Sequence, residues 1–201
     1  MSFDQLMIHY MAPSICGIKP ANLFSVSEAM FCRKAFFQWK KQLGSHGLSC
    51  ISERIRGGRI LILVYNKSWI ETLLLQKDVN SYLEKKGYFS NEKGSLTAEV
   101  SANFFIQLKE RLRCTVKSGE CFPHEVGIIL GYPLQDVIEF ESNCGKNCKY
   151  CGTWKCYSDV YKARQVQALF RECSSLCSKW FDQGYSLGQI VKTYKKVVQA
   201  A

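Results

Sequence analysis

One stretch near the middle of the chain, residues 122–157, constrains the fold more than any other. It reads FPHEVGIILGYPLQDVIEFESNCGKNCKYCGTWKCY. Pro123 suits the first position of a helix, where its missing N–H is not needed, and Gly131 suits the residue just past a helix end. Pro133 can open the next helix at once. We therefore predict two short helices joined by a tight turn and followed directly by a cysteine-rich loop.

The two short helices are similar in pattern to a DNA-binding helix-turn-helix. The second helix, however, has no Lys or Arg and carries the carboxylates of Asp136, Glu139 and Glu141. A recognition helix lies against phosphates, which would repel these carboxylates. We interpret the pair as a structural helical hairpin.

Four cysteines follow the helix pair: Cys144, Cys148, Cys151 and Cys156. The first three have the C-x3-C-x2-C spacing of radical S-adenosylmethionine enzymes. Those enzymes continue with a barrel of strands and helices, whereas the residues after Cys151 are few and have a helical pattern. A motif is only as informative as its context, so we exclude this class.

A bound metal is the more credible interpretation of the loop. The pair Cys148-x2-Cys151 has the spacing of a zinc knuckle or of half an iron–sulfur site. Neighbouring lysines favour the thiolate form that binds metals. Two further ligands can come from the loop itself or from the next helix, where residues four apart face the same way. The two candidate pairs are Cys144 with Cys156 and Cys173 with Cys177.

Structural roles compete with each of these assignments. Cys173 also falls on an apolar helical stripe, where a buried cysteine behaves as a small hydrophobic side chain. His9 and His124 are candidate further ligands, although a hydrogen-bonded structural histidine is the default. His124 and Glu125 are adjacent and point about 100° apart on a helix, so they do not form an acid–base pair.

The remaining chain predicts an α+β fold. We expect mostly loop over residues 1–24, a helix from Val26 to Leu43 opened by a capping box at 25–28, and a β-hairpin over 48–65 around Gly57-Gly58. An amphipathic helix follows Ser95, with Leu96, Val100, Phe104, Leu108 and Leu112 on one stripe. Ser158 or Asp159 caps a long helix that runs to about Phe181. We predict one mostly helical domain, residues 1–201, with one hairpin packed among about eight helices and a candidate boundary near 87–95.

Composition limits location and partners. The 11 cysteines are an odd number, which does not suit a closed disulfide framework. The N-terminus lacks the pattern of a signal peptide, and the longest apolar run is far shorter than the about 20 residues of a membrane span. We expect a cytoplasmic protein with reduced thiols. Its net charge of +10 permits nucleic acid as a partner.

The motifs together resemble an uncharacterised bacterial family, domain of unknown function 3793, of Clostridia-like anaerobes. The matching residues are P-H-E-x-G-x-x-L-G-Y-P-x-x-D-V from Pro123, C-x-x-C-G-x-W-K-x-Y from Cys148, and His9, Pro13, Gly17, Lys19 and Pro20. In this family, cysteines like Cys148, Cys151 and Cys173 are typical, whereas Cys144 and Cys156 are not. The resemblance implies a site that spans loop and helix, with His9 or His124 as a further ligand, and a connection with iron uptake.

Three functions follow as hypotheses. The first is a small protein of iron or redox handling that holds zinc, iron or an iron–sulfur cluster through Cys148, Cys151 and Cys173, with His124, His9, Cys177 and Cys144 as additional candidates. The second is an interaction module that docks a protein or nucleic acid through a surface of Glu125, Tyr132, Trp154, Lys155 and Tyr157. The third is an enzyme with Cys148 or Cys151 as nucleophile and His124 as base.

Overall fold

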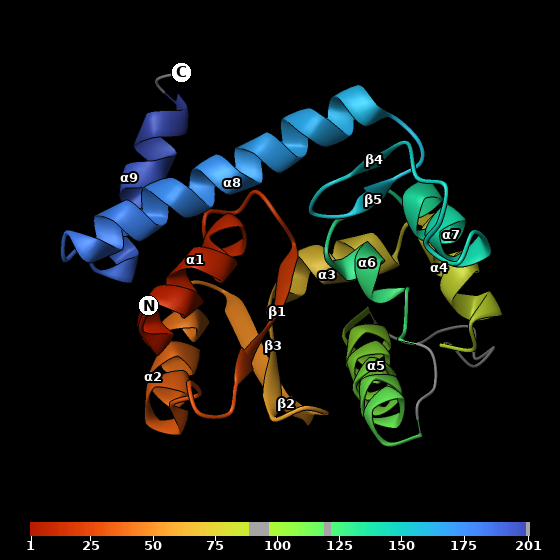
Figure 1. Ribbon diagram of the computed structural model, residues 1–201, viewed down its shortest axis with the longest axis horizontal. Helices are drawn as coiled ribbons and strands as arrows, with labels where there is room; N and C mark the ends of the chain where they lie inside the picture. Colours follow the sequence, from red (N-terminus) through yellow and green to blue (C-terminus); the bar gives the residue numbers. More distant parts are fainter. Residues whose placement is uncertain (89–96, 119–121, 200–201) are drawn as a thin grey trace. The chain divides into compact units, whose positions relative to one another are not determined.

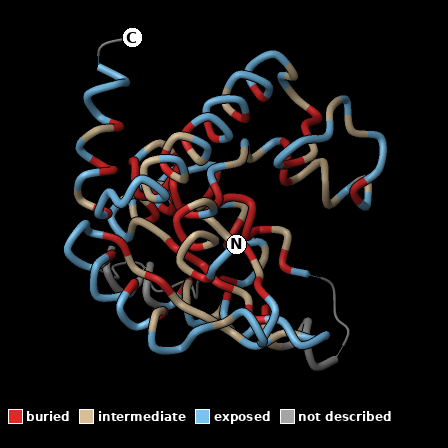
Figure 2. The backbone as a smooth tube through the Cα atoms, turned by 60° about the vertical axis from the view of Figure 1, so that its left-hand side comes forward, coloured by how far each residue is buried: buried red, intermediate tan, exposed pale blue. Residues whose placement is uncertain are grey.

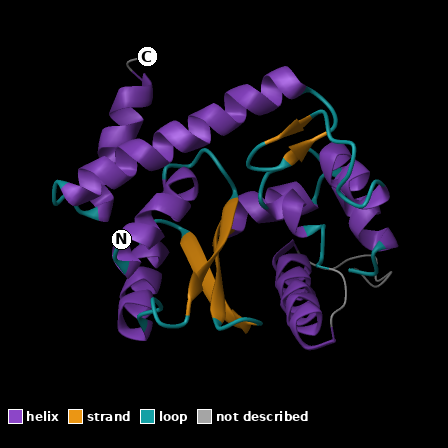
Figure 3. Ribbon diagram, in the orientation of Figure 1, coloured by secondary structure: helices purple, strands orange, loops and turns teal. Residues whose placement is uncertain are grey.

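The computed structural model describes residues 1–88, 97–118 and 122–199 (Figure 1). These ranges contain nine helices, a three-stranded sheet and a two-stranded hairpin (Figure 3). The predicted α+β, mostly helical class is confirmed. No helix within the described ranges is long and apolar enough to cross a membrane.

The chain divides into two compact units. The first contains Met1–Arg54, Gly58–Asn66 and Asp159–Ala201, and the second contains Ile55–Gly57 and Lys67–Ser158. Most of the candidate boundary at 87–95 lies outside the described residues. That the whole chain is one domain stays a prediction.

The first unit combines helices from both ends of the chain with the larger sheet. Its helices are α1 (Phe3–Ile15), α2 (Arg33–Gly44), α8 (Val160–Asp182) and α9 (Leu187–Gln199), and its strands are β1 (Ala21–Ser27), β2 (Leu48–Ile55) and β3 (Arg59–Asn66). The strand order is β1-β3-β2, and β1 runs antiparallel to β3 from Ala21↔Tyr65 to Ser27↔Arg59. The predicted hairpin is confirmed, with positive φ at both Gly57 and Gly58.

The predicted start of the helix at Val26 is wrong. The capping box at 25–28 does not form, because Ser25 belongs to β1 and its hydroxyl accepts a hydrogen bond from the Arg59 guanidinium at 2.9 Å. Strand β3 has apolar residues on both faces, and as the central strand it needs a partner on each edge. The helix therefore begins at Arg33 rather than Val26.

The N-terminal segment is a helix rather than a loop. Ser2 and Gln5 form a capping box: the Gln5 amide donates to the Ser2 hydroxyl at 3.2 Å, and the Ser2 amide donates to the Gln5 side chain at 2.7 Å. Pro13 lies near the end of this helix. Its effect was overestimated from sequence, because a proline in the last turn leaves the preceding turns intact.

The core of the first unit lies between α1, α8 and the sheet. Met7, Ile8 and Met11 of α1 are completely buried there, and Figure 2 shows buried positions recurring along the helices. Three cysteines, Cys16, Cys173 and Cys177, belong to this same core.

The second unit contains the central motif. Its elements are α3 (Lys67–Leu74), α4 (Lys77–Lys85), α5 (Thr97–Ser118), α6 (Val126–Ile129), α7 (Leu134–Ser142), β4 (Tyr150–Cys151) and β5 (Lys155–Cys156). The predicted helix pair is present as α6 and α7. A Cβ atom added to Gly127 would lie 2.9 Å from Val137 Cγ2, so glycine allows α6 and α7 to approach closely. On α5, Phe104, Leu108 and Leu112 are buried, whereas the side chains of Leu96 and Val100 lie outside the described part.

Candidate metal centre

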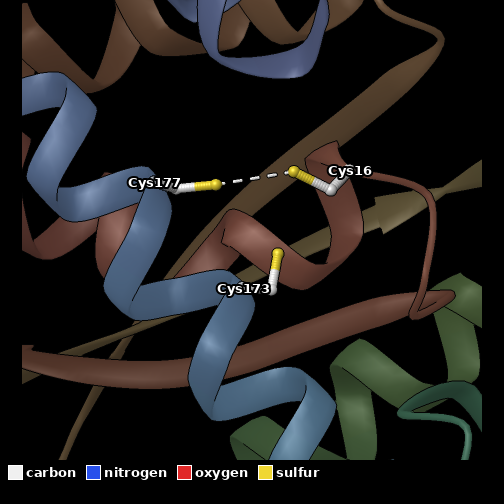
Figure 4. A group of neighbouring side chains, drawn as sticks. All are labelled: Cys16, Cys173 and Cys177. Carbon is white, nitrogen blue, oxygen red and sulfur yellow. Dashed lines mark hydrogen bonds between the residues drawn. The ribbon is translucent and has the colours of Figure 1, made fainter. Parts of the chain in front are cut away.

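Three cysteine sulfur atoms converge inside the first unit. The Sγ atoms of Cys16, Cys173 and Cys177 all lie within 4.8 Å of one another, and all three residues are buried. Figure 4 shows Cys16 facing the two cysteines of α8; its Sγ lies 3.5 Å from that of Cys177. Among the described His, Cys, Asp and Glu residues, this is the group that meets the spacing of a metal site.

The helix geometry explains why the sulfur atoms meet. Cys173 and Cys177 are four residues apart on α8 and so share one face. Cys16 is the cap residue at the end of α1. The chain then turns through Gly17, whose φ is +76°, and the amide of Ile18 donates back to the Pro13 carbonyl at 2.9 Å. This turn fixes Cys16 at the end of the helix.

Polar contacts hold α1 against α8 in one register. The Gln5 side chain donates to Asp182 at 2.9 Å, and His9 Nδ1 lies 3.2 Å from the Ser178 hydroxyl. From the first pair to the second, the residue number rises by four on α1 and falls by four on α8. The two helices therefore run antiparallel. The same direction brings Cys16 to the level of the α8 cysteines. His9 acts in this interface and is not part of the three-sulfur group.

Hydrogen bonds within the group favour one thiolate. Those from Cys16 and Cys177 lower the pKa of the Cys173 thiol, and against the opposing effect of burial the Tyr194 hydroxyl lowers it further. The pKa of Cys16 is raised by its hydrogen bonds to Cys173 and Cys177 and by burial. For Cys177, the hydrogen bond with Cys16 favours the thiolate, but the bond to Cys173 and burial prevail and raise the pKa.

This arrangement suits a single soft metal ion. Zinc–sulfur bonds are about 2.3 Å long, so sulfur atoms around one ion lie about 4 Å apart. The observed spacing comes close to this value. In a [4Fe–4S] cluster each cysteine binds a different iron atom, which needs wider spacing than a single ion. Thiolates select zinc, copper(I) and iron over harder cations.

The other predicted cysteines lie in the second unit. Cys148 is half-buried, Cys151 is exposed in β4, and Cys144 is exposed. Cys156 is buried in β5. A site that combines Cys148 and Cys151 with Cys173 of the first unit stays a prediction. Cys173 and Cys177, predicted together on one helix face, are brought together with Cys16.

Buried polar contacts hold the loop that carries Cys148 and Cys151. The Asp136 carboxylate accepts hydrogen bonds from Trp154 Nε1 at 2.8 Å and from the amides of Tyr157 and Ser158 at 2.9 and 2.8 Å. Although burial opposes it, these bonds lower the pKa of Asp136. Asp136 thus fastens the hairpin to α7.

The residues predicted as a docking surface have partners inside the second unit. Trp154 and Tyr157 are buried, and the Tyr132 ring stacks on Trp154 with centroids 5.0 Å apart. Lys155 donates to the Gly145 carbonyl at 2.6 Å. Glu125 is buried and accepts hydrogen bonds from its neighbours. These contacts give the central motif a structural role, and its role in docking stays a prediction.

His124 lies beside an aromatic ring. Its imidazole is 5.0 Å from the Phe140 ring centroid in an edge-on arrangement. His124 does not belong to a group with metal-site spacing among the described residues. Its predicted roles as ligand or base stay predictions.

Sequence reasoning did not select Cys16 as a candidate metal ligand. The residue lies in a segment that was expected to be loop, and its distance along the chain from Cys173 gives no spacing motif. Two local signals pointed to it: the capping box at Ser2–Gln5, which starts α1, and Gly17, which ends it. The antiparallel packing of α1 on α8 supplies the remaining information.

Fold and site together describe an α+β protein with a buried three-thiol group. The chain belongs to the family described as Protein of unknown function (DUF3793), whose model matches residues 7–191. Neither the curated proteins nor the solved structures gave a match. Occurrence in Clostridia-like anaerobes and a cytoplasmic location stay predictions.

Proposed function

We propose that this protein binds one thiophilic metal ion, with zinc as the first candidate, through Cys16, Cys173 and Cys177. The observation that carries the proposal is the convergence of three buried sulfur atoms within 4.8 Å, from two helices far apart in sequence. A role in iron or redox handling follows if the ion bound in the cell is iron or copper rather than zinc.

A purely structural role for these cysteines explains less. Single buried cysteines act as small hydrophobic side chains, and Cys50 of β2 is an example in the same core. Packing alone does not require three such residues to meet. Their convergence places three thiols together in the interior, and the hydrogen bonds that lower the pKa of Cys173 favour a buried thiolate, whose charge is unfavourable there without compensation. A bound cation compensates that charge.

The Tyr194 hydroxyl completes the surroundings of the group. It comes from α9 and hydrogen-bonds with Cys173. Groups that donate to metal-bound sulfur orient the ligand and tune its affinity. We assign Tyr194 this positioning role, with the three cysteines as ligands.

The proposal is tested by elemental analysis of protein purified without oxygen. Cys148→Ser/Cys151→Ser protein, which lacks the hairpin thiols, should retain close to one metal ion per chain, and adding Cys173→Ser to it should remove most of that metal. Cys50→Ser is the matched control, because Cys50 is equally buried in the same core but stands outside the group. Circular dichroism of each variant separates loss of metal from loss of fold.

Cobalt(II) titration of protein with an intact three-thiol group gives a second measurement that needs no substitution in the core. Cobalt bound by three thiolates has a strong sulfur-to-metal charge-transfer band, and its intensity reports the number of thiolates. The titration is made with Cys148→Ser/Cys151→Ser protein, so that the hairpin thiols do not contribute. Absence of this band, together with metal-free anaerobic protein, would contradict the proposal.

A further inference from the structure

The hairpin of the second unit presents two thiols of its own. Strands β4 and β5 pair antiparallel, with Tyr150 opposite Cys156 and Cys151 opposite Lys155. Cys151 is exposed and Cys148 is half-buried. Both are therefore accessible to a ligand from outside the unit, in contrast to the cysteines of the first unit.

The backbone around these thiols is held by many contacts. The amide of Lys149 donates to the Cys156 carbonyl at 2.9 Å, and the amide of Gly152 donates to the Trp154 carbonyl at 3.1 Å. Asn147, just before Cys148, has a φ of +60°. A cysteine pair on such a fixed turn loses little freedom when it binds a metal ion.

A buried hydroxyl belongs to the residue directly after β5. Tyr157 is only 4% exposed, and its hydroxyl oxygen has no hydrogen-bond partner among the described residues. A buried donor without a partner is uncommon in proteins. This hydroxyl belongs to the same segment, residues 148–157, as the two thiols.

We propose that the hairpin is half of a zinc site, which the Cys148 and Cys151 of a second copy of this chain complete. Structural zinc takes four ligands in a tetrahedron, and the described residues supply no third ligand to this pair at metal-site spacing. Two copies related by a twofold axis supply four identical thiolates. The site is distinct from the three-thiol group and does not depend on it.

The charge of the completed site suits the lysines that each hairpin brings to it. Four thiolates around Zn²⁺ carry a net charge of −2, and each hairpin brings the lysines at positions 146, 149 and 155. Lys146 and Lys149 are exposed. The anionic centre thus offsets the repulsion between two basic chains, each with a net charge of +10. Without zinc, this repulsion keeps the copies apart.

The test is sedimentation of wild type in a reducing buffer that keeps thiols free, with zinc or with a chelator. We expect zinc to tighten self-association by roughly a hundredfold or more, because metal–thiolate bonds supply most of the contact energy. Wild type should bind one more zinc ion per pair of chains than Cys148→Ser/Cys151→Ser, which should stay monomeric. The matched control is Cys144→Ser, an exposed cysteine of the same loop.

Three outcomes would overturn the inference. They are monomeric wild type in zinc, equal zinc content in wild type and the double variant, and zinc-dependent dimers of the double variant. Because both substituted cysteines are accessible, the double variant should keep its fold, which circular dichroism checks. Loss of metal in Cys173→Ser concerns the first unit alone, so the two proposals fail separately.

Discussion

The two thiol groups of this protein are built in opposite ways. In the first unit, Cys16, Cys173 and Cys177 lie in the core and come from helices at opposite ends of the chain. In the second unit, Cys148 and Cys151 lie three residues apart on an accessible hairpin. The first group brings three thiols together but is buried, whereas the second is accessible but has only two thiols. Local spacing therefore reveals the pair in the hairpin, whereas only tertiary packing assembles the three-thiol group.

The largest expected difference between the groups is in thiol reactivity. We expect an alkylating reagent to modify Cys151 at least about a thousandfold faster than Cys173 or Cys177 in metal-free protein, because the buried thiols react only when the core opens. Mass spectrometry of timed samples gives both rates. Cys32, exposed in the first unit, is the control and should react as fast as Cys151. Similar rates for Cys173 and Cys151 would contradict the buried geometry.

The second difference is in stability. Zinc at about a thousandfold excess over its dissociation constant should raise the free energy of unfolding by about 4 kcal/mol. Cys148→Ser/Cys151→Ser should keep this gain, whereas Cys173→Ser should lose it. Denaturant unfolding with zinc and with chelator measures both. The account is contradicted if Cys148→Ser/Cys151→Ser loses the zinc-dependent rise in unfolding free energy and Cys173→Ser keeps it.

A third test probes the interior near the three-thiol group. Lys19 is buried, and its Nζ lies 5.3 Å from the centroid of the Phe170 ring, three residues before Cys173 on α8. Burial lowers the pKa of Lys19 to about 8. At pH 7 the folded protein keeps the charged Lys19 amine away from water, which lowers the free energy of unfolding. This destabilisation disappears as the pH rises from about 8 to the ordinary lysine pKa, because the buried amine loses its proton.

The unfolding free energy of wild type should therefore rise relative to Lys19→Met by about 3 kcal/mol between pH 7 and 10.5. Titration of buried thiols such as Cys50, whose pKa is raised to about 11 by burial, affects both proteins and cancels in the comparison. Lys34→Met, at an exposed position of α2, is the control. A constant difference across this pH range would show that the interior around Lys19 is solvated.

The smallest expected effect concerns how the hairpin is held. Asp136→Asn keeps an oxygen for the amides of Tyr157 and Ser158 but places an NH₂ group or a weaker acceptor against Trp154. We expect a loss of about 2 kcal/mol in unfolding free energy and faster hydrogen exchange at the Tyr157 amide. Glu139→Gln, one turn further along α7, should change neither. An unchanged exchange rate in Asp136→Asn would mean that other contacts hold the hairpin.

Local patterns in the sequence predicted many of the elements correctly. Gly57-Gly58 indicated the hairpin, Asp159 indicated the start of α8, and the proline and glycine pattern at 123–133 indicated the helix pair. Each of these signals lies within a few residues of the element that it specifies. The Cys148-x2-Cys151 pair was found in the same way, from spacing alone.

The errors have a common physical cause. Ser25 and Glu28 have the composition of a capping box, but pairing with the apolar central strand β3 outweighed the local preference. Cys16 acquires its neighbours from the packing of α1 on α8, which no short window contains. Candidate ligands that share a helix face, such as Cys173 and Cys177, could be paired from sequence, but their third partner could not.

The most direct test of the three-thiol site is X-ray absorption at the zinc edge of Cys148→Ser/Cys151→Ser protein loaded with one equivalent of zinc. This variant leaves Cys16, Cys173 and Cys177 as the group arranged to bind the ion. We predict three sulfur neighbours at about 2.3 Å and at most one oxygen or nitrogen. A zinc ion surrounded mainly by oxygen and nitrogen would contradict the site and place the protein's metal binding elsewhere.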